Sequence, residues 1–91
     1  MEVYKFYLTN ETNRSKIVIV EPIHIVEESL KPNEEFELHF SSASKLENRD
    51  LFSIEIKEDA FVITINWNMS EPASRSIKTF VNEVETFKFE F

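Results

Sequence analysis

Apolar and polar residues alternate along most of the chain with a period of two, which is typical of β-strands and differs from the 3.6-residue period of helices. The alternating apolar positions carry mostly β-branched and aromatic residues, which fit a pleated surface. Because turn-forming residues separate the runs at intervals of about 8–12 residues, the pattern favours a sandwich or a small barrel. The predicted strands cover residues 3–8, 17–20, 23–26, 36–40, 52–56, 61–67, 77–81 and 84–91.

Proline and asparagine residues mark several of the expected turns. Pro22 interrupts the second apolar run, because proline cannot donate to a strand ladder. Pro32 and Asn33 stand in the order that a type I or II turn prefers, and Asn33 tolerates the left-handed conformation that glycine usually adopts. Further turns are expected at residues 10–13, 58–59 and 82–83, a loop at 68–74, and a loop or a single helical turn at 41–49.

The segment 72–82 also fits a second interpretation. Its apolar residues recur at helical spacing, and Ser70 could cap a helix that carries Pro72 in its first turn. The sequence alone therefore leaves a short helix near 72–82 open beside a hairpin. The apolar residues at helical spacing are Ala73, Ile77, Phe80, Val81 and Val84.

Length and composition complete the prediction of the fold. The chain has 91 residues, which is enough for one modest hydrophobic core and too few for two. Its residues are 42% hydrophobic and 13% aromatic, so large apolar side chains are available to fill that core. We therefore expect a single all-β domain over residues 1–91: a small antiparallel β-sandwich, Ig-like or jelly-roll-like, of seven or eight strands.

Two residue types that are missing from the chain narrow its chemistry. Without cysteine there are no disulfides, cysteine nucleophiles, zinc fingers or iron–sulfur clusters, and a reducing compartment fits this composition. Without glycine there is no glycine-rich phosphate loop, dinucleotide fingerprint or nucleophile elbow of the usual type. No long apolar span or leader-like segment stands out. We therefore expect a cytoplasmic protein that is not an enzyme, uses no cofactor and does not bind membranes.

Acidic residues dominate the charge of the chain. The formal net charge of −7 argues against nucleic acid as a partner, because binding to phosphate backbones depends on lysine and arginine. Six glutamates between residues 21 and 37 are opposed by Lys31 as the one lysine or arginine of that segment. They could steer a basic protein, or they could form a solvated rim that protects an edge strand. These glutamates are Glu21, Glu27, Glu28, Glu34, Glu35 and Glu37.

A metal site is the alternative prediction. If the strand at 23–26 paired with the strand at 36–40 across the Pro32 turn, His24, Glu37 and His39 could share one face of the sheet. Two imidazoles and a carboxylate could then bind Zn²⁺ or a similar ion, with a position open for water. The competing interpretation is that both histidines lie half-exposed on the solvent side of a strand.

Three aromatic residues are candidates for surface contacts. Trp67 could form a platform for sugar or peptide, although a sandwich of this size usually needs its single tryptophan in the core. Tyr7 and Phe80 could face outward, and an apolar patch shared by them would indicate a dimer or partner surface. Otherwise both residues cover an open end of the core.

Two pieces of the chain resemble a family of small, functionally uncharacterised bacterial all-β proteins. Ile17–Pro22 followed by Leu30–Phe36 resembles an aliphatic run, Glu-Pro, a short strand, Leu-x-Pro-Gly-Glu and another strand. The second piece of the chain that resembles this family is Val62–Trp67 together with the later hairpin at 82–83. The resemblance favours the hairpin over the helix and implies no chemistry. The chain departs from the family pattern at Asn33 and Glu83, where glycine is usual, and at Ile23, where an aromatic residue is common.

Together these observations predict a small acidic module that acts by binding another protein. The expected contact is an edge strand or the acidic segment 21–37, and the expected partner is a basic or strand-presenting protein. A homodimer belongs to the same prediction, and an inhibitor or immunity-like protein would be one concrete form of it.

Overall fold

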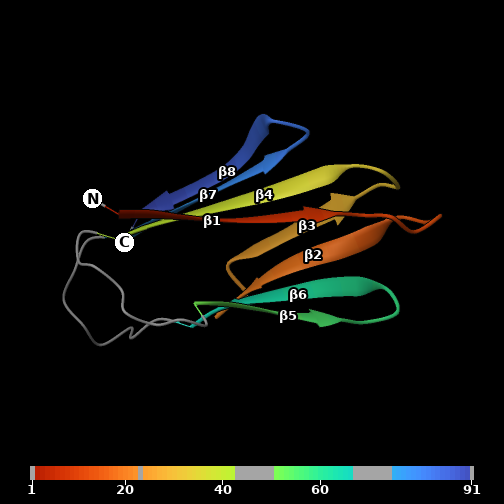
Figure 1. The fold of residues 1–91 in the computed structure, drawn as a ribbon, viewed down its shortest axis with the longest axis horizontal. Coiled ribbons are helices and arrows are strands. Elements are labelled where there is room, and N and C mark those ends of the chain that lie inside the picture. Colours follow the sequence, from red (N-terminus) through yellow and green to blue (C-terminus); the bar gives the residue numbers. More distant parts are fainter. Residues whose placement is uncertain (1, 23, 43–50, 67–74, 91) are drawn as a thin grey trace.

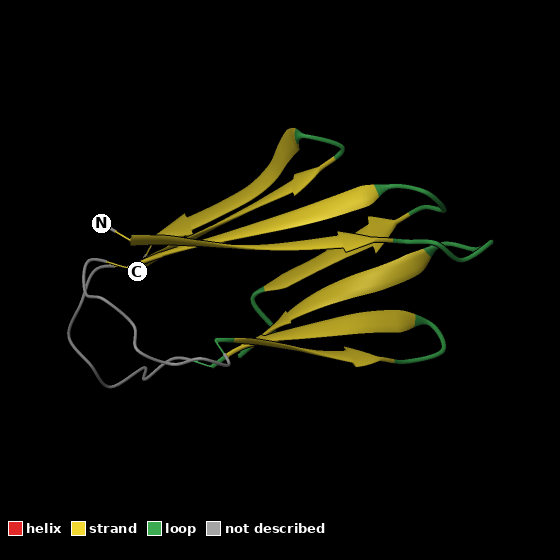
Figure 2. Ribbon diagram, viewed as in Figure 1, coloured by secondary structure: helices red, strands yellow, loops and turns green. Residues whose placement is uncertain are grey.

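A computed structural model describes residues 2–22, 24–42, 51–66 and 75–90, and Figure 2 shows that strands and their connections account for all of them. No helix in this part of the chain is long and apolar enough to span a membrane. The eight strands are β1 (Glu2–Thr9), β2 (Lys16–Glu21), β3 (Val26–Leu30), β4 (Glu35–Ser42), β5 (Phe52–Ile56), β6 (Ala60–Ile65), β7 (Arg75–Val81) and β8 (Val84–Glu90).

The strands form two four-stranded sheets that pack face to face (Figure 1). One sheet, called sheet A below, has the order β1-β4-β7-β8, and the other, sheet B, has the order β3-β2-β6-β5. Neighbours are antiparallel except β2 and β6, which run parallel. The prediction of an all-β sandwich is confirmed, and β2, whose residues 17–20 are apolar on both faces, is an interior strand.

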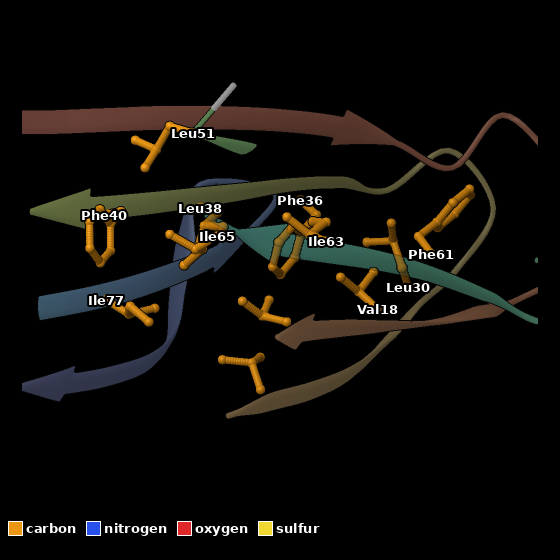
Figure 3. Close-up of a cluster of buried hydrophobic side chains, with 12 residues drawn as sticks. Val18, Leu30, Phe36, Leu38, Phe40, Leu51, Phe61, Ile63, Ile65 and Ile77 are labelled. Atoms are coloured by element: carbon orange, nitrogen blue, oxygen red, sulfur yellow. The ribbon is translucent and has the colours of Figure 1, made fainter. Parts of the chain in front are cut away.

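The core lies between the inner faces of the two sheets (Figure 3). Phe36, Leu38 and Phe40 point inward from β4 and are fully buried, while the residues between them face outward. Ile63 and Val18 meet them from sheet B and are equally inaccessible. The period of two in the sequence is therefore the alternation between core and outer face.

The prediction of a strand at 23–26 is wrong, because β2 ends at Glu21 and β3 begins at Val26. Pro22 and His24 lie in the turn after β2, residue 23 lies outside the described residues, and His24 has a positive φ of 53°. The Ile25 amide donates to the Val20 carbonyl over 2.9 Å and closes the turn. The next strand is β3, whose inward positions are Val26, Glu28 and Leu30. A glutamate in the middle of the inward face hides this strand from an analysis of apolar periodicity.

The helix considered for 72–82 is also wrong where the structure describes that segment. Residues 75–81 form β7, which pairs with β4 on one side and β8 on the other. Ile77 and Thr79 are buried on the inner face, so this segment follows the two-residue alternation of a strand and not the spacing of a helix. Residues 72–74 lie outside the described residues, as do the predicted loop at 68–74, Trp67 and Phe91. Of the loop or helical turn predicted at 41–49, residues 41 and 42 belong to β4 instead, and 43–49 lie outside the described residues.

The predicted turns that carry a left-handed residue are confirmed. Asn33 has a φ of 67° at the third position of the turn that Lys31 opens, and the Glu34 amide donates to the Lys31 carbonyl over 3.1 Å. With Pro32 at the second position this is a type II turn. Asn82 and Glu83 have φ values of 49° and 69°, which is the two-residue type I′ turn of a hairpin.

Asn10 connects the β1–β2 turn with the β3–β4 turn from a fully buried position. Its Nδ2 donates to the carbonyls of Arg14 and Leu30 over 3.0 and 2.9 Å. Its Oδ1 accepts from the amide and the hydroxyl of Thr12. Its backbone groups bond to Glu34 and Asn33 in the β3–β4 turn. Every polar atom of this side chain is used, so Asn10 fixes the end of β1 against both neighbouring turns.

Candidate protein-interaction edge

The six glutamates of the segment 21–37 do not form one surface. Glu21 and Glu27 flank the β2–β3 turn, where Glu27 lies near His24. Glu34 and Glu35 lie at the opposite end of the sandwich, beside the β7–β8 turn. The strand β3 separates these two pairs of glutamates by its whole length. The acidic segment of the sequence is therefore divided between two ends of the sandwich.

The remaining two glutamates each bond to side chains of sheet A. Glu28 points inward from β3, and its Oε1 accepts hydrogen bonds from the hydroxyls of Thr79 and Thr86 over 2.8 and 2.7 Å. Glu37 lies on the outer face of sheet A and is bonded to His39. Glu28 therefore holds β3 of sheet B against β7 and β8, which is a structural role.

The three residues of the predicted metal site are in two places. The pairing that would have joined them is wrong, because β3 pairs with β2 in sheet B while β4 belongs to sheet A. Glu37 and His39 are neighbours on β4, and the His39 ring contacts the Phe80 ring at a tilt of 47°, with centroids 4.7 Å apart. His24 instead lies between Glu21 and Glu27. The described residues contain no group of three or more ligand side chains arranged to hold a metal ion.

Tyr7 and Phe80 both face outward from sheet A, which is one of the two alternatives that the sequence left open. The register places Glu37 opposite Tyr7 on one side and opposite Phe80 on the other, so the two rings do not form one apolar patch. Phe80 is half-buried against His39, whereas Tyr7 is 55% exposed. Tyr7 is therefore the member of this pair that a partner could contact, and it lies on β1.

The two sheets have four edge strands, and three of them carry features that discourage pairing. The strands β3 and β5 have five residues each. The third, β8, has a register shift against Thr79 and Phe80 and carries Glu85, Lys88 and Glu90. Short length, bulges and charged side chains are the usual ways in which proteins protect a sheet edge.

The fourth edge strand, β1, is the longest of the four and pairs with its neighbour without a bulge. It has eight residues, and its register with β4 runs without interruption from Glu2 opposite Ser42 to Thr9 opposite Glu35. Its charged residues are Glu2 and Lys5, and it contains no proline. No described strand pairs with its other side. Its backbone groups on that side are therefore a template for a further strand.

Exposed apolar side chains surround this edge. Val3 and Tyr7 on the outer face of β1 are 52% and 55% exposed. Below it, Phe6 meets Phe52 of β5 with ring centroids 5.6 Å apart. Ile54 and Ile56 of β5 lie opposite the buried Ile63 and Phe61, so they point to the inner side of sheet B. They are nevertheless 39% and 68% exposed, because sheet A ends at β1.

Sequence reasoning did not find this edge. The period of two separates the faces of each strand, but it does not tell which strands lie at a border. Ile54 and Ile56 belong to the apolar face of their strand, and how far they are exposed depends on the order of strands in both sheets. The signal that was available is the uninterrupted, proline-free run of β1 with few charges.

No protein-family model, no curated protein and no solved structure matches this chain. The resemblance described above therefore rests on its two sequence pieces alone, and the argument for function rests on the geometry of the edge.

Proposed function

We propose that this protein is a non-catalytic protein-binding module that accepts an extended strand of its partner along β1. The observation that carries the proposal is the eight-residue edge of β1, in continuous register with β4 and unpaired on its other side among the described strands. A strand added there would satisfy the outward backbone groups of β1, which gives affinity through main-chain hydrogen bonds.

The side chains around β1 support the same function. An added strand would place its own side chains beside Val3 and Tyr7 and so cover one flank of each, and it would extend sheet A over Ile54 and Ile56. Burial of apolar surface is worth about 25 cal/mol per Å², so these four side chains add to the backbone contribution. Exposed apolar groups that are gathered along one border are typical of a binding surface.

The acidic segment contributes less than the sequence predicted. Its glutamates are divided between two ends of the molecule, and Glu28 is engaged with Thr79 and Thr86. We therefore assign recognition to the backbone of β1 and its apolar neighbours, with the charge of −7 keeping the protein soluble. The absence of cysteine fits a cytoplasmic site of action.

Photo-crosslinking from β1 tests this proposal. A benzoylphenylalanine at position 7 in place of Tyr7 is exposed beside the edge, and the same probe in place of Glu85 on β8 serves as the matched control. In the producing cells, irradiation is expected to give a protein adduct from position 7 and none from position 85. If neither position gives an adduct, or if position 85 gives the stronger one, β1 is not the binding edge.

A metal function gains no specific support. His24 is separated from Glu37 and His39 by the strand pairing, so the three residues predicted as ligands do not share a site. Each histidine instead has carboxylates of its own neighbourhood as partners. The structure therefore carries no second proposal.

A further inference from the structure

We propose that the strand that pairs with β1 belongs to a second copy of this chain, antiparallel, with Phe6 opposite Phe6 of that copy. The inference rests on the proposed function and names its partner. It would join two copies of sheet A into one continuous eight-stranded sheet around a two-fold axis.

Symmetry leaves few arrangements for such a pair. An antiparallel pair of identical strands is related by an axis perpendicular to the sheet, so the outer face of one copy continues the outer face of the other. Opposite residues must then both be outward or both inward. The axis therefore passes between one residue of β1 and the same residue of the second copy. The central candidates for that residue are Lys5, Phe6 and Tyr7.

The single lysine of β1 decides between these arrangements. An axis at Lys5 sets two ammonium groups directly opposite each other, at the cross-strand distance of about 5 Å where like charges repel. An axis at Tyr7 pairs only residues 5–9. An axis at Phe6 pairs residues 3–9 of both copies and sets Lys5 opposite the Tyr7 ring, a contact that is favourable for a cation. The Phe6 register is thus long and free of direct like-charge pairs.

The rows of side chains across the outer face of sheet A complement each other in this register. One row carries lysines on three of its four strands, and the next row carries two glutamates. Pairing Lys5 with Tyr7 joins the lysine row of each copy to the glutamate row of the other, so opposite charges continue across the new boundary. The first row is Lys5, His39, Lys78 and Lys88, and the second is Tyr7, Glu37, Phe80 and Glu85.

The second sheet gives an independent reason for a partner strand with apolar residues. Ile54 and Ile56 point to the inner side of sheet B but lie beyond the cover of β1. A neighbouring β1 would bring its inward residues Tyr4, Phe6 and Leu8 beside this position, and these are only partly buried against the core of their own chain, so each keeps apolar surface for a contact. A second copy therefore supplies apolar side chains at the place where β5 lacks cover.

Single-cysteine variants test the register, because the chain has no cysteine of its own. Lys5→Cys and Tyr7→Cys are both on the outer face and lie directly opposite each other in the Phe6 register. Their sulfurs can bond across the pair, whereas 5–5 and 7–7 are diagonal, with Cβ atoms about 7–8 Å apart and too distant for a disulfide. Mixing the two variants in a glutathione buffer is expected to give mainly the mixed dimer, which intact-mass spectrometry separates from either homodimer.

A matched pair on β8, Glu85→Cys mixed with Lys88→Cys, reports random collisions on the same face. The proposal is overturned if the β1 mixture gives no more dimer than this control, or if Lys5→Cys alone gives the dominant dimer. Failure of the underlying function gives a different result. If the protein is monomeric here but the probe at position 7 crosslinks to another protein in cells, β1 binds a strand and the second copy is not its partner.

Discussion

The strands β1 and β8 close the same sheet on opposite sides, and they end it in different ways. The β8 strand is bulged, and its Thr86 leaves the ladder with β7 and bonds to Glu28 across the sandwich. The β1 strand is regular from end to end in its pairing with β4, and the buried Asn10 holds the residue that follows it against the neighbouring turns. One edge is therefore shaped by a cross-sheet contact and the other keeps its full length available.

This difference separates stability from recognition. The polar contacts of Glu28 and Asn10 lie between elements of the fold, where their loss would affect the free energy of unfolding. The exposed side chains of β1 contact little within the chain, so their replacement should affect association and leave unfolding nearly unchanged. Variants at the two edges can test that separation.

Replacing Asn10 should have the largest effect on folding. Asn10→Ala removes the donors to Arg14 and Leu30 and the acceptor for Thr12 at a buried site. Buried polar groups that lose their partners cost about 1–3 kcal/mol each, so we expect a loss of roughly 3 kcal/mol in urea unfolding. Asn13→Ala, in the same turn but exposed, should cost little. Equal effects would show that the Asn10 network is not the anchor of β1.

The contact between β8 and β3 should rank second. Glu28→Ala leaves the buried hydroxyl of Thr79 without its carboxylate acceptor and should lower the free energy of unfolding by about 2 kcal/mol. Glu28→Gln keeps one oxygen acceptor and should cost less. The neighbour Glu27 is exposed, and Glu27→Ala serves as the control. A Glu28→Ala protein as stable as that control contradicts the assigned role.

Charge at position 7 should tune association through Lys5 of the second copy. Tyr7→Lys sets two lysines opposite each other and should raise the dimer dissociation constant at least about tenfold, or 1.4 kcal/mol. Tyr7→Glu loses the same ring but faces Lys5 with an opposite charge, so it should weaken the dimer less. Sedimentation equilibrium measures both constants. Indistinguishable values for the two variants would show that Lys5 does not lie opposite position 7.

The smallest expected effect concerns the β7–β8 turn. Glu83 adopts a φ of 69°, which is unfavourable for a residue with a Cβ. Glu83→Gly removes that cost at the position where Asn-Gly is the preferred type I′ pair, and should stabilise the fold by about 0.5–1 kcal/mol in urea unfolding. The dimer constant should not change. A destabilised variant would mean that the Glu83 side chain contributes more than its backbone conformation costs.

Much of the fold followed from local patterns in the sequence. The alternation in β4 and β6 and the pair Pro32-Asn33 are properties of neighbouring residues, so their strands and turn could be predicted. The β3 strand could not, because Glu28 occupies an inward position for a partner 51 residues away. The helical spacing in 75–81 competed with strand alternation until pairing with β4 decided it.

The candidate site depended on information that the sequence does not carry locally. The sequence offered an outward position for Tyr7 as one alternative, but its place at a sheet edge follows from the order β1-β4-β7-β8. The predicted metal site of His24, Glu37 and His39 is not formed. It required the strand before the Pro32 turn to pair with β4, whereas β3 pairs with β2. The glutamates of the segment 21–37 are close in sequence, but the course of β3 carries them to two ends of the sandwich (Figure 1).

Native mass spectrometry of the untagged protein tests the central claim most directly, because it reports the number of chains in the assembly. We expect twice the mass of one chain at micromolar concentration, with a clearly larger fraction of single chains for Tyr7→Lys and an unchanged fraction for Glu85→Lys. A single-chain mass for the natural sequence across the whole concentration range would contradict the pairing of two copies through β1.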